Sequence, residues 1–470
     1  MSNFRQITRR NLIRVGGTAA LGAGVAAVAR PAAARTRNTK TGPYDAIVIG
    51  AGFAGVTAAR DLRDLGLRPL VLEANNRIGG RVWTSTHFGT QVELGGAWFH
   101  PNYHRTYAEM TRYNLTTVVD APPTSVYVRT GNSGYQSVDP VVTANRMEQL
   151  LTQIFDGSQN YFAQPNQPLF RSDLLASVDP LSLADRMNQL NLTTQDRNLI
   201  QGLMATYSGG DAANGGLTAL AQWWALCGWN AQGWNQMTSA RVNGGITSLV
   251  QAILNGAQAD VRLSTPVVQI AQANNQITVT TQGGATFTAP VAVVATPVNK
   301  WKTITFSPGL PTVHADATNE GVGVRPIAAK MWLRVSGVPG RVFAQGAPGD
   351  PIASLVTHQH LSNGDNLMIA INGPGLNVGS LAAVNAAVQQ IIPTATVVGK
   401  KVQDWANDPY SGGGWGMRKP GQLLRQLPGL HQPHGRITFA GGDMTSGWVG
   451  SFEGAIQDGA RAASQAAALI

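Results

Sequence analysis

The chain has little cysteine and little charge. Its 470 residues include one cysteine, Cys227, so no disulfide can form within the chain. Charged residues make up 13% of the sequence and hydrophobic residues 43%, which excludes a disordered polyelectrolyte and allows a core large enough for two domains. Histidine and cysteine do not recur at the spacing of a zinc site. We therefore expect no metal site, and we interpret Cys227, which has tryptophans around it, as a buried packing thiol.

Acidic residues are missing from the first 43 positions. Eight basic residues lie there, so they account for eight of the ten net positive charges, and the other 427 residues carry a net charge of +2. The basic balance therefore belongs to a leader, and no basic face is expected on the folded part of the chain. We expect no nucleic acid partner.

The leader also lacks an uncharged run long enough to cross a membrane. Residues 15–29 form an uncharged stretch of about 15 residues, whereas a transmembrane helix needs about 20 apolar residues. Residues 8–14 instead resemble a twin-arginine export signal, and a small-residue site follows at 32–34. We expect a signal peptide over residues 1–34, cleavage near Ala34, a linker over 35–43, and a periplasmic or secreted protein without a stable membrane span.

Three glycines stand where their conformational freedom has a chemical use. Gly50, Gly52 and Gly55 lie between an apolar stretch that predicts a buried strand and a stretch with apolar residues at helical spacing. Such glycines allow a tight turn and let backbone N–H groups and a helix N-terminus approach a pyrophosphate. Glu73 lies 23 residues after Gly50, about where an acidic side chain at the end of the second strand binds ribose hydroxyls. The pattern predicts a dinucleotide site.

A second glycine-rich motif narrows the cofactor to FAD. The motif consists of Arg77, Gly79, Gly80 and Arg81. Additional accessible backbone with a guanidinium beside the first loop suits a long, extended cofactor. The stretch from Glu73 to Arg81 resembles the same stretch of the flavin amine oxidase family, which includes monoamine oxidases, polyamine oxidases and L-amino acid oxidases. Relatives often carry arginine where this chain has Asn75, so Arg77 or Arg81 is left to supply charge to the phosphates.

The order of strand and helix patterns implies two interleaved domains. The resemblance covers residues 44–470 and implies an α/β fold, in which a Rossmann-like FAD-binding domain is interleaved with an α+β substrate domain that has a mixed antiparallel sheet and a helical part. The FAD-binding domain is expected over residues 44–117, 238–299 and 411–470. The substrate domain is expected over 118–237, which has a helical pattern, and over 300–410.

Hydrophobic periodicity and turn residues predict the individual elements. Strands are expected at 44–49, 329–335, 366–372 and 436–440, and helices at 53–65, 142–155, 181–190, 194–208, 217–226, 378–391 and 453–469. Short β-like runs are expected at 261–270, 277–281, 285–288 and 291–295. Asn-Asn and Gly-Gly pairs separate some of these runs, and the whole stretch predicts one β-meander.

The family resemblance implies further FAD contacts. It places the backbone of Val267 at the adenine and Asp443 near the ribityl and phosphate groups. The helix that opens at Glu453 would point its N–H groups at the cofactor, where its positive end favours the charge of a reduced flavin. Monoamine oxidases bond the flavin to a cysteine where this chain has Gly414, so FAD is expected to bind noncovalently.

The resemblance also implies an aromatic cage for the amine. An amine must be neutral to release a hydride from the neighbouring carbon, and a dry aromatic slot disfavours the protonated form. Trp415 matches one wall of the cage in relatives, and Phe452 matches the other. Lys330, a charge inside an apolar run, matches a lysine that holds a water against flavin N5. Catalytic roles are therefore expected for Lys330, Trp415 and Phe452.

Four residues are expected to line the substrate pocket. Trp98 stands where L-amino acid oxidases have an arginine for the carboxylate, so an amino acid is not the expected substrate, and His100 stands where many polyamine-type relatives have an acid. Tyr207 and Thr238 match pocket positions of bacterial nicotine oxidoreductases, the subgroup that the chain resembles most. We expect hydride transfer to flavin N5 from the carbon next to the nitrogen of a cyclic secondary or tertiary amine, nicotine-like, or of an aryl-alkyl amine.

Other interpretations are still open. A flavin-dependent desaturase of a non-amine substrate would share the first glycine loop, and an exported flavin-binding protein without amine turnover would keep the cofactor site. The expected electron acceptor is oxygen or a periplasmic cytochrome. The sequence does not determine the oligomeric state, and a homodimer is among the alternatives.

Overall fold

The computed structural model describes residues 43–129, 134–325 and 327–470. The predicted signal peptide, its cleavage site near Ala34 and the predicted linker up to residue 42 lie outside the described residues. None of the helices in the described ranges combines the length and the hydrophobicity that crossing a bilayer requires.

A parallel five-stranded sheet forms the centre of the predicted cofactor domain. Its strands, in spatial order, are β10 (Asp260–Arg262), β2 (Pro69–Leu72), β1 (Ala46–Ile49), β14 (Val291–Val294) and β21 (Ile437–Phe439). All residues of β1, β2, β14 and β21 are buried, because other elements cover both faces of the sheet. The strands come from three distant parts of the chain, so the sheet joins these parts into one body.

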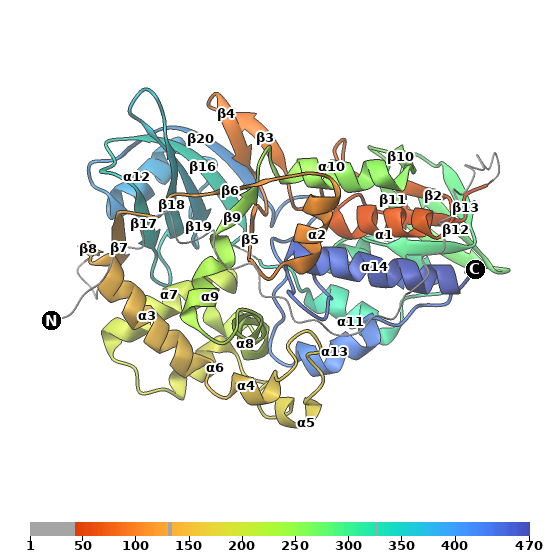
Figure 1. The fold of residues 1–470 in the computed structure, drawn as a ribbon, viewed down its shortest axis with the longest axis horizontal. Helices are drawn as coiled ribbons and strands as arrows, with labels where there is room; N and C mark the ends of the chain where they lie inside the picture. The colour runs from red at the N-terminus through yellow and green to blue at the C-terminus, as the bar shows by residue number, and fades with distance from the viewer. Residues whose placement is uncertain (1–42, 130–133, 326) are drawn as a thin grey trace, which may run out of the picture. The chain divides into compact units, whose positions relative to one another are not determined.

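Three helices cover one face of this sheet. They are α1 (Phe53–Asp64), α10 (Ile246–Ala257) and α14 (Phe452–Ala468), with α1 in the middle (Figure 1). α1 and α14 approach closely because Gly459 has no side chain. A Cβ on Gly459 would lie 2.3 Å from the carbonyl oxygen of Ala54.

A smaller sheet and two helices lie on the other face. The sheet has the order β13 (Thr286–Ala289), β12 (Gln276–Thr281), β11 (Val267–Ala273), β15 (Thr305–Ser307), and the helices are α11 (Thr312–Glu320) and α13 (Gln422–Leu430), with the short helix η3 at Val298–Thr303. Ile47 of the parallel sheet packs in this core with Ile277 and Trp301. The predicted single meander over 261–295 is wrong at both ends, because β10 and β14 join the parallel sheet. β14 is apolar at every position and buried throughout, as a central parallel strand requires.

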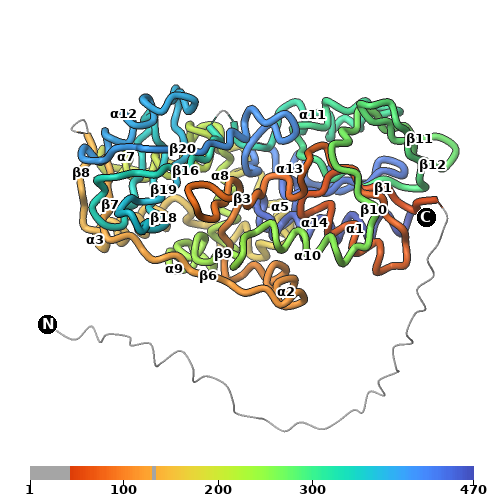
Figure 2. The backbone as a smooth tube through the Cα atoms, turned by 90° about the horizontal axis from the view of Figure 1, so that it is seen from above, coloured from red at the N-terminus to blue at the C-terminus, as the bar shows by residue number. Residues whose placement is uncertain are grey.

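A seven-stranded mixed sheet dominates the predicted substrate domain. Its order is β20 (Thr396–Asp404), β16 (Ala329–Ser336), β19 (Asn366–Asn372), β18 (Ile352–His360), β17 (Val342–Gln345), β7 (Ser125–Arg129), β8 (Tyr135–Val138). Helix α12 (Leu381–Ile391) packs on this sheet with Val384 and Val388 in its core. The sheet lies at the other end of the described chain from β1 and α1 (Figure 2).

The helical part of the substrate domain follows β8. It contains α3 (Pro140–Ile154), α4 (Ser158–Tyr161), α5 (Ser172–Leu175), α6 (Leu183–Asn188), α7 (Thr194–Tyr207), α8 (Leu217–Leu226) and α9 (Ala231–Trp234), with short helices η1 (Ala212–Asn214) and η2 (Asn235–Thr238). α8 is buried along its whole length, which explains its almost uninterrupted apolar sequence.

Small elements lie between the two large sheets. A three-stranded sheet has the order β5 (Trp98–Phe99), β9 (Ala240–Val242), β6 (Thr117–Val119), a hairpin pairs β3 (Thr84–His87) with β4 (Thr90–Glu93), and α2 (His104–Arg112) follows β5. Segments near residues 95, 120 and 240 are thereby brought next to β16.

Candidate active site

The glycine loop after β1 has the shape that a pyrophosphate needs. Gly50 has φ +106°, and a Cβ there would lie 2.9 Å from the Ala295 carbonyl oxygen. A Cβ on Gly55 would lie 1.9 Å from the Gly50 carbonyl oxygen. Gly52 pairs with Gly79 in a parallel bridge, so the two predicted glycine motifs lie against each other. A side chain is therefore excluded at Gly50 and Gly55, whereas a Cβ on Gly52 would make only ordinary contacts at 3.8 Å. The backbone of this loop can approach a ligand closely.

Glu73 lies at the end of β2 beside this loop. Its buried carboxylate accepts hydrogen bonds from the backbone N–H of Ala51 at 2.7 Å and of Asn75 at 2.8 Å. The Asn75 side chain also donates to Glu73, at 3.1 Å. The acidic group predicted to meet the ribose is therefore at the carboxyl edge of the sheet, where ligands of such sheets bind.

The two arginines of the second motif have different surroundings. The guanidinium of Arg77 donates to the carbonyl oxygen of Gly80 at 3.0 Å and stacks 4.4 Å above the ring of Trp83, so it holds the loop together. Arg81 donates to the Gly414 carbonyl oxygen at 2.8 Å, and its Nη1 lies 2.7 Å from Oδ1 of Asp443. Of these two, Arg81 is the one that reaches the second acidic residue of the predicted cofactor site.

Two buried polar atoms at the sheet edge have unused bonding capacity. Asp443 is 1% exposed at its side chain and accepts from Val298 N at 3.2 Å through Oδ2, but the Arg81 contact to Oδ1 lacks hydrogen-bond geometry. The hydroxyl of Thr296, just after β14, has no partner within the described residues. Buried polar atoms normally have partners, so these atoms, next to the glycine loops, fit the polar groups of a dinucleotide.

Val267 and Glu453 lie at different depths. Val267 is the first residue of β11 and is half-buried. The Glu453 carboxylate is buried, and it accepts hydrogen bonds from the backbone N–H of Arg105 at 3.0 Å and of Thr106 at 2.8 Å. It therefore caps the N-terminus of α2. A cofactor contact by this residue would come from the backbone at the start of α14, and its side-chain role was not visible in the sequence.

Lys330 is buried at the start of β16. Its Nζ donates to the Gly95 carbonyl oxygen at 2.9 Å and lies 4.5 Å from the centroid of the Trp98 ring. Burial lowers the pKa of Lys330 to about 7, and the charge of Glu93 opposes this shift. Burial also raises the pKa of Glu93. A lysine in these surroundings can exchange a proton near neutral pH.

Trp415 is hydrogen-bonded to the backbone of Tyr207, whose ring belongs to an aromatic cluster. Its Nε1 donates to the Tyr207 carbonyl oxygen at 3.1 Å. The Tyr207 ring makes edge contacts with Trp223 and Trp234, at centroid distances of 5.6 and 5.9 Å. The structure thus brings together Trp415 and Tyr207, which the sequence assigned to the cage and the substrate pocket, and adds two tryptophans that sequence reasoning missed. The apolar sequence of α8 indicates that Trp223 is buried, but it marks this residue only as part of the core.

Phe452 packs in a second aromatic cluster. Its ring lies 5.3 Å from Phe53, 6.1 Å from Phe99 and 5.8 Å from Tyr103 between centroids, and the residue is 8% exposed. Among the described residues no ring contact joins Phe452 to Trp415. The cage with Phe452 as its second wall therefore stays a prediction.

His100 and Thr238 occupy contrasting positions. His100 is buried, with Nδ1 accepting from Asn102 N at 2.9 Å and Nε2 facing the Gly233 carbonyl oxygen at 3.0 Å. This pattern requires the neutral ring with its proton on Nε2, and burial lowers the pKa of His100. Both nitrogens are thus engaged within the protein. Thr238 ends η2 and is exposed.

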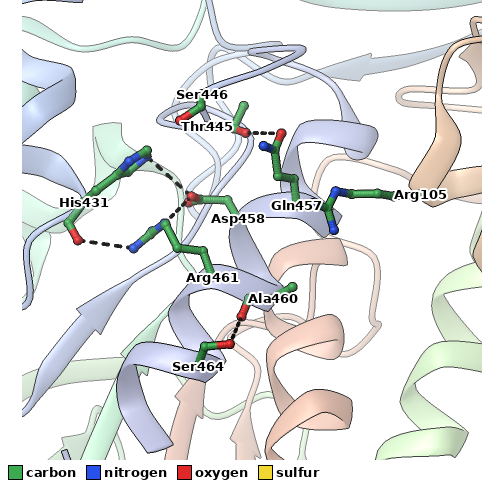
Figure 3. A pocket seen from close by; sticks show the side chains of 9 residues that line it. All are labelled: Arg105, His431, Thr445, Ser446, Gln457, Asp458, Ala460, Arg461 and Ser464. Carbon is green, nitrogen blue, oxygen red and sulfur yellow. Dashed lines mark hydrogen bonds and ion pairs between the residues drawn. The ribbon is translucent and has the colours of Figure 1, made fainter. Parts of the chain in front are cut away.

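A cavity of about 320 Å³ lies beside α14, away from these residues. Its lining comprises Arg105, His431, Thr445, Ser446, Gln457, Asp458, Ala460, Arg461 and Ser464 (Figure 3). Asp458 in its wall is already paired with Arg461 at 2.7 Å and faces His431 at 3.5 Å. No residue predicted to bind cofactor or substrate lines the cavity, so it is separate from the candidate site.

The described ranges contain no group of three or more histidine, cysteine, aspartate or glutamate side chains arranged to hold a metal ion. Cys227 is buried, and burial raises the pKa of its thiol to about 12, so the thiol is protonated at neutral pH.

Comparisons with known proteins identify the family. Residues 53–334 and 382–467 match the family described as flavin containing amine oxidoreductase. Nicotine dehydrogenase of Pseudomonas putida (strain DSM 28022 / S16) is 33% identical over 97% of this chain and 95% of its own length. Pseudooxynicotine dehydrogenase of Pseudomonas sp is 31% identical over 97% of this chain and 94% of its own length.

Solved structures give the same fold. Wild-type putrescine oxidase bound to putrescine superposes with a TM-score of 0.77 at 20% identity, over 91% of this chain and 99% of that one. Cyclohexylamine oxidase from Brevibacterium oxydans IH-35A gives 0.72 at 21% identity, with the same coverage. The predicted α/β fold is therefore confirmed. The chain belongs to the flavin containing amine oxidoreductase family, and it is an FAD-dependent amine oxidoreductase.

Proposed function

We propose that the substrate is a cyclic secondary or tertiary amine of nicotine type, or an aryl-alkyl amine. The observation that carries this proposal is the aromatic cluster of Tyr207, Trp223 and Trp234, together with the hydrogen bond from the Trp415 indole to the Tyr207 carbonyl oxygen. Such surroundings disfavour an ammonium ion and offer flat apolar surface to a ring. Trp98 in place of an arginine disfavours a carboxylate-bearing substrate. The names of the two Pseudomonas relatives, which concern nicotine and pseudooxynicotine, support the same class.

Different residues of the chain have separate roles in the proposed reaction. When bound, FAD accepts a hydride from the carbon next to the amine nitrogen. The glycine loops with Glu73, Arg81 and Asp443 hold the cofactor. Trp415 excludes water and orients the amine, which favours its neutral form. Lys330, with its Nζ next to the Gly95 carbonyl oxygen, would give or take a proton during the reaction of the bound cofactor.

An anaerobic titration with a panel of amines tests the proposal. Nicotine and pseudooxynicotine are compared with putrescine and an L-amino acid, and bleaching of the flavin is followed. We expect the ring-bearing amines to reduce the flavin at least 100-fold faster. Trp415→Ala should lose most of this preference, whereas Phe170→Ala, at an aromatic residue 55% exposed, should keep it. Equal rates for putrescine and nicotine would refute the substrate class.

Lys330→Met tests the second assigned role. The variant keeps a long apolar side chain but loses the ammonium group. We expect it to bind FAD and to slow flavin reduction or reoxidation at least tenfold, which corresponds to about 1.4 kcal/mol. Stopped-flow absorbance measures both half-reactions. Unchanged rates in both would remove Lys330 from the mechanism.

Noncovalent FAD, export and the electron acceptor belong to the same proposal. Gly414 has no nucleophilic side chain, so acid or denaturant should release yellow cofactor from the protein. The acceptor is oxygen or a periplasmic cytochrome, and the rates of reoxidation by each distinguish them. Amino-terminal sequencing of exported protein should begin near residue 35, and a start at Met1 would contradict the leader.

A further inference from the structure

Asp120, Arg241 and Trp98 form a polar group next to Lys330. The three-stranded sheet assembles it, because Arg241 in the central strand β9 pairs with Trp98 of β5 on one side and with Val118 of β6 on the other. Asp120 directly follows β6. Three segments that lie far apart in the sequence thereby converge beside β16.

Hydrogen bonds hold Asp120 from two sides. Its Oδ2 accepts from the indole Nε1 of Trp98 at 2.9 Å and from Nε of Arg241 at 3.0 Å. The side chains of Asp120 and Arg241 are 22% and 13% exposed, so solvent screens this ion pair only in part. Charge-assisted hydrogen bonds of this kind are strong and directional. The orientation of the Trp98 ring is therefore fixed by Asp120.

The face of the same indole meets Lys330. The Nζ of Lys330 lies 4.5 Å from the ring centroid, within the range of a cation–π interaction. An indole that donates its N–H to a carboxylate gains electron density on the ring, which strengthens its attraction for a cation. Asp120 thus acts on Lys330 through Trp98 as well as through its own charge.

Other charged groups also face Lys330. The charges of Glu93 and Asp120 favour its protonated form, and Arg241 opposes it. His358 lies with Nδ1 3.8 Å from Oδ1 of Asp120. Burial lowers the pKa of His358 to about 4, so this ring is neutral at neutral pH. Asp120 therefore offsets the positive charge of Arg241, which would otherwise act on Lys330.

We propose that Asp120 is a positioning residue for Lys330. Through Trp98, Asp120 fixes the ammonium group of Lys330 against the indole face and sustains its positive charge. This role rests on the one proposed above for Lys330. Trp98, which the sequence assigned to the substrate pocket, then has a second task. Arg241 keeps the carboxylate of Asp120 ionised and in place.

The pH dependence of flavin reoxidation tests this role without knowledge of the amine. The holoenzyme is reduced with dithionite and mixed with oxygenated buffer between pH 6 and 10. We expect Asp120→Asn and Trp98→Phe each to move the bend of the profile to lower pH by about half a pH unit, because each weakens a contact that favours the protonated lysine. The double variant should shift by less than the sum, since part of the effect of Asp120 on Lys330 passes through Trp98.

The midpoint potential of the flavin, measured against pH, gives a second readout that does not depend on turnover. Its bend should move with that of the kinetic profile. Asp350→Asn serves as the matched control, because Asp350 is also paired with an arginine, Arg129, at 2.9 Å. This variant should leave both profiles unchanged. Trp98→Phe leaves the Asp120–Arg241 ion pair in place. This variant therefore tests the link from Asp120 to Lys330 even when Asp120→Asn does not fold.

The outcomes separate this inference from the proposed function. Unshifted profiles in both variants, together with a strong effect of Lys330→Met, would overturn the role of Asp120 alone. A shift that persists when Asp120→Asn is combined with Lys330→Met would also overturn it, because the effect would then not pass through Lys330. No effect of Lys330→Met on either half-reaction would remove the proposed role of Lys330 and, with it, that of Asp120.

Discussion

At the scale of single residues, Gly55 illustrates how little room the cofactor loop leaves. A Cβ on Gly55 would lie 1.9 Å from the Gly50 carbonyl oxygen, so any side chain pushes α1 away from β1. We expect Gly55→Val to retain less than about a tenth of the wild-type FAD, as measured by flavin absorbance relative to protein after purification with added FAD. Gly283→Ala is the control, since a Cβ there meets nothing within 4 Å. Normal FAD content in Gly55→Val would contradict the assignment of the loop.

Residues with a role set by local sequence were the ones that could be predicted. Gly50 and Glu73 follow from a strand, a turn and a helix within about 25 residues, because the pyrophosphate site is built from one continuous segment. The role of Asp120 could not be predicted in this way. The role of Asp120 depends on its hydrogen bonds with Trp98 and Arg241, which lie 22 residues before it and 121 residues after it. No local sequence pattern indicates contacts over such separations.

At the scale of elements, α11 carries a buried histidine, His314, whose protonation we expect to oppose folding in acid. His314 is 1% exposed, lies 4.3 Å from Phe439 between ring centroids, and has no hydrogen bond of normal geometry to its ring nitrogens within the described residues. Burial lowers the pKa of His314 from 6.5 to about 4. In the unfolded chain His314 therefore binds a proton near pH 6.5, whereas in the folded chain it binds one only near pH 4. The stability that the chain gains from burying neutral His314 is fully present above about pH 6.5 and is lost progressively as the pH falls toward 4.

Replacement of His314 should make the free energy of unfolding depend less on pH below pH 7. We expect His314→Phe to lose less stability than the wild type between pH 7 and pH 5, by at most about 2 kcal/mol. Urea unfolding at both pH values measures the difference, and His360→Gln, at an exposed histidine, provides the control. An identical pH dependence in His314→Phe and wild type would show that other groups govern acid sensitivity.

Element types were more predictable than their partners. The helical pattern at 217–226 and the strand pattern at 366–372 reproduce α8 and β19, because periodicity reports which faces are buried. The stretch 261–295 was harder. Its turn residues favoured a meander, but pairing in the parallel sheet depends on β2 and β21, almost 200 residues before β10 and more than 140 after β14.

At the scale of the whole molecule, the cofactor should stabilise the folded chain. The residues proposed to hold FAD come from the two ends and the middle of the described chain, and the unfolded chain cannot bring them together. A ligand that binds only the folded state adds about 2.7 kcal/mol when its concentration is 100 times its Kd. We expect the Tm of apoprotein to rise steadily with the logarithm of FAD concentration, as followed by circular dichroism. Gly55→Val should show no such rise, and a wild-type Tm independent of FAD would contradict the shared site.

The topology also determines when the enzyme can be completed during synthesis. β21 pairs with β14, and α14 packs on α1, yet both elements lie beyond residue 436. A nascent chain that still has them inside the ribosome lacks Asp443, one edge of the parallel sheet and the helix beside the glycine loop. We therefore expect flavin to be captured only after translation has passed these segments, so that cofactor loading follows synthesis of the whole sheet.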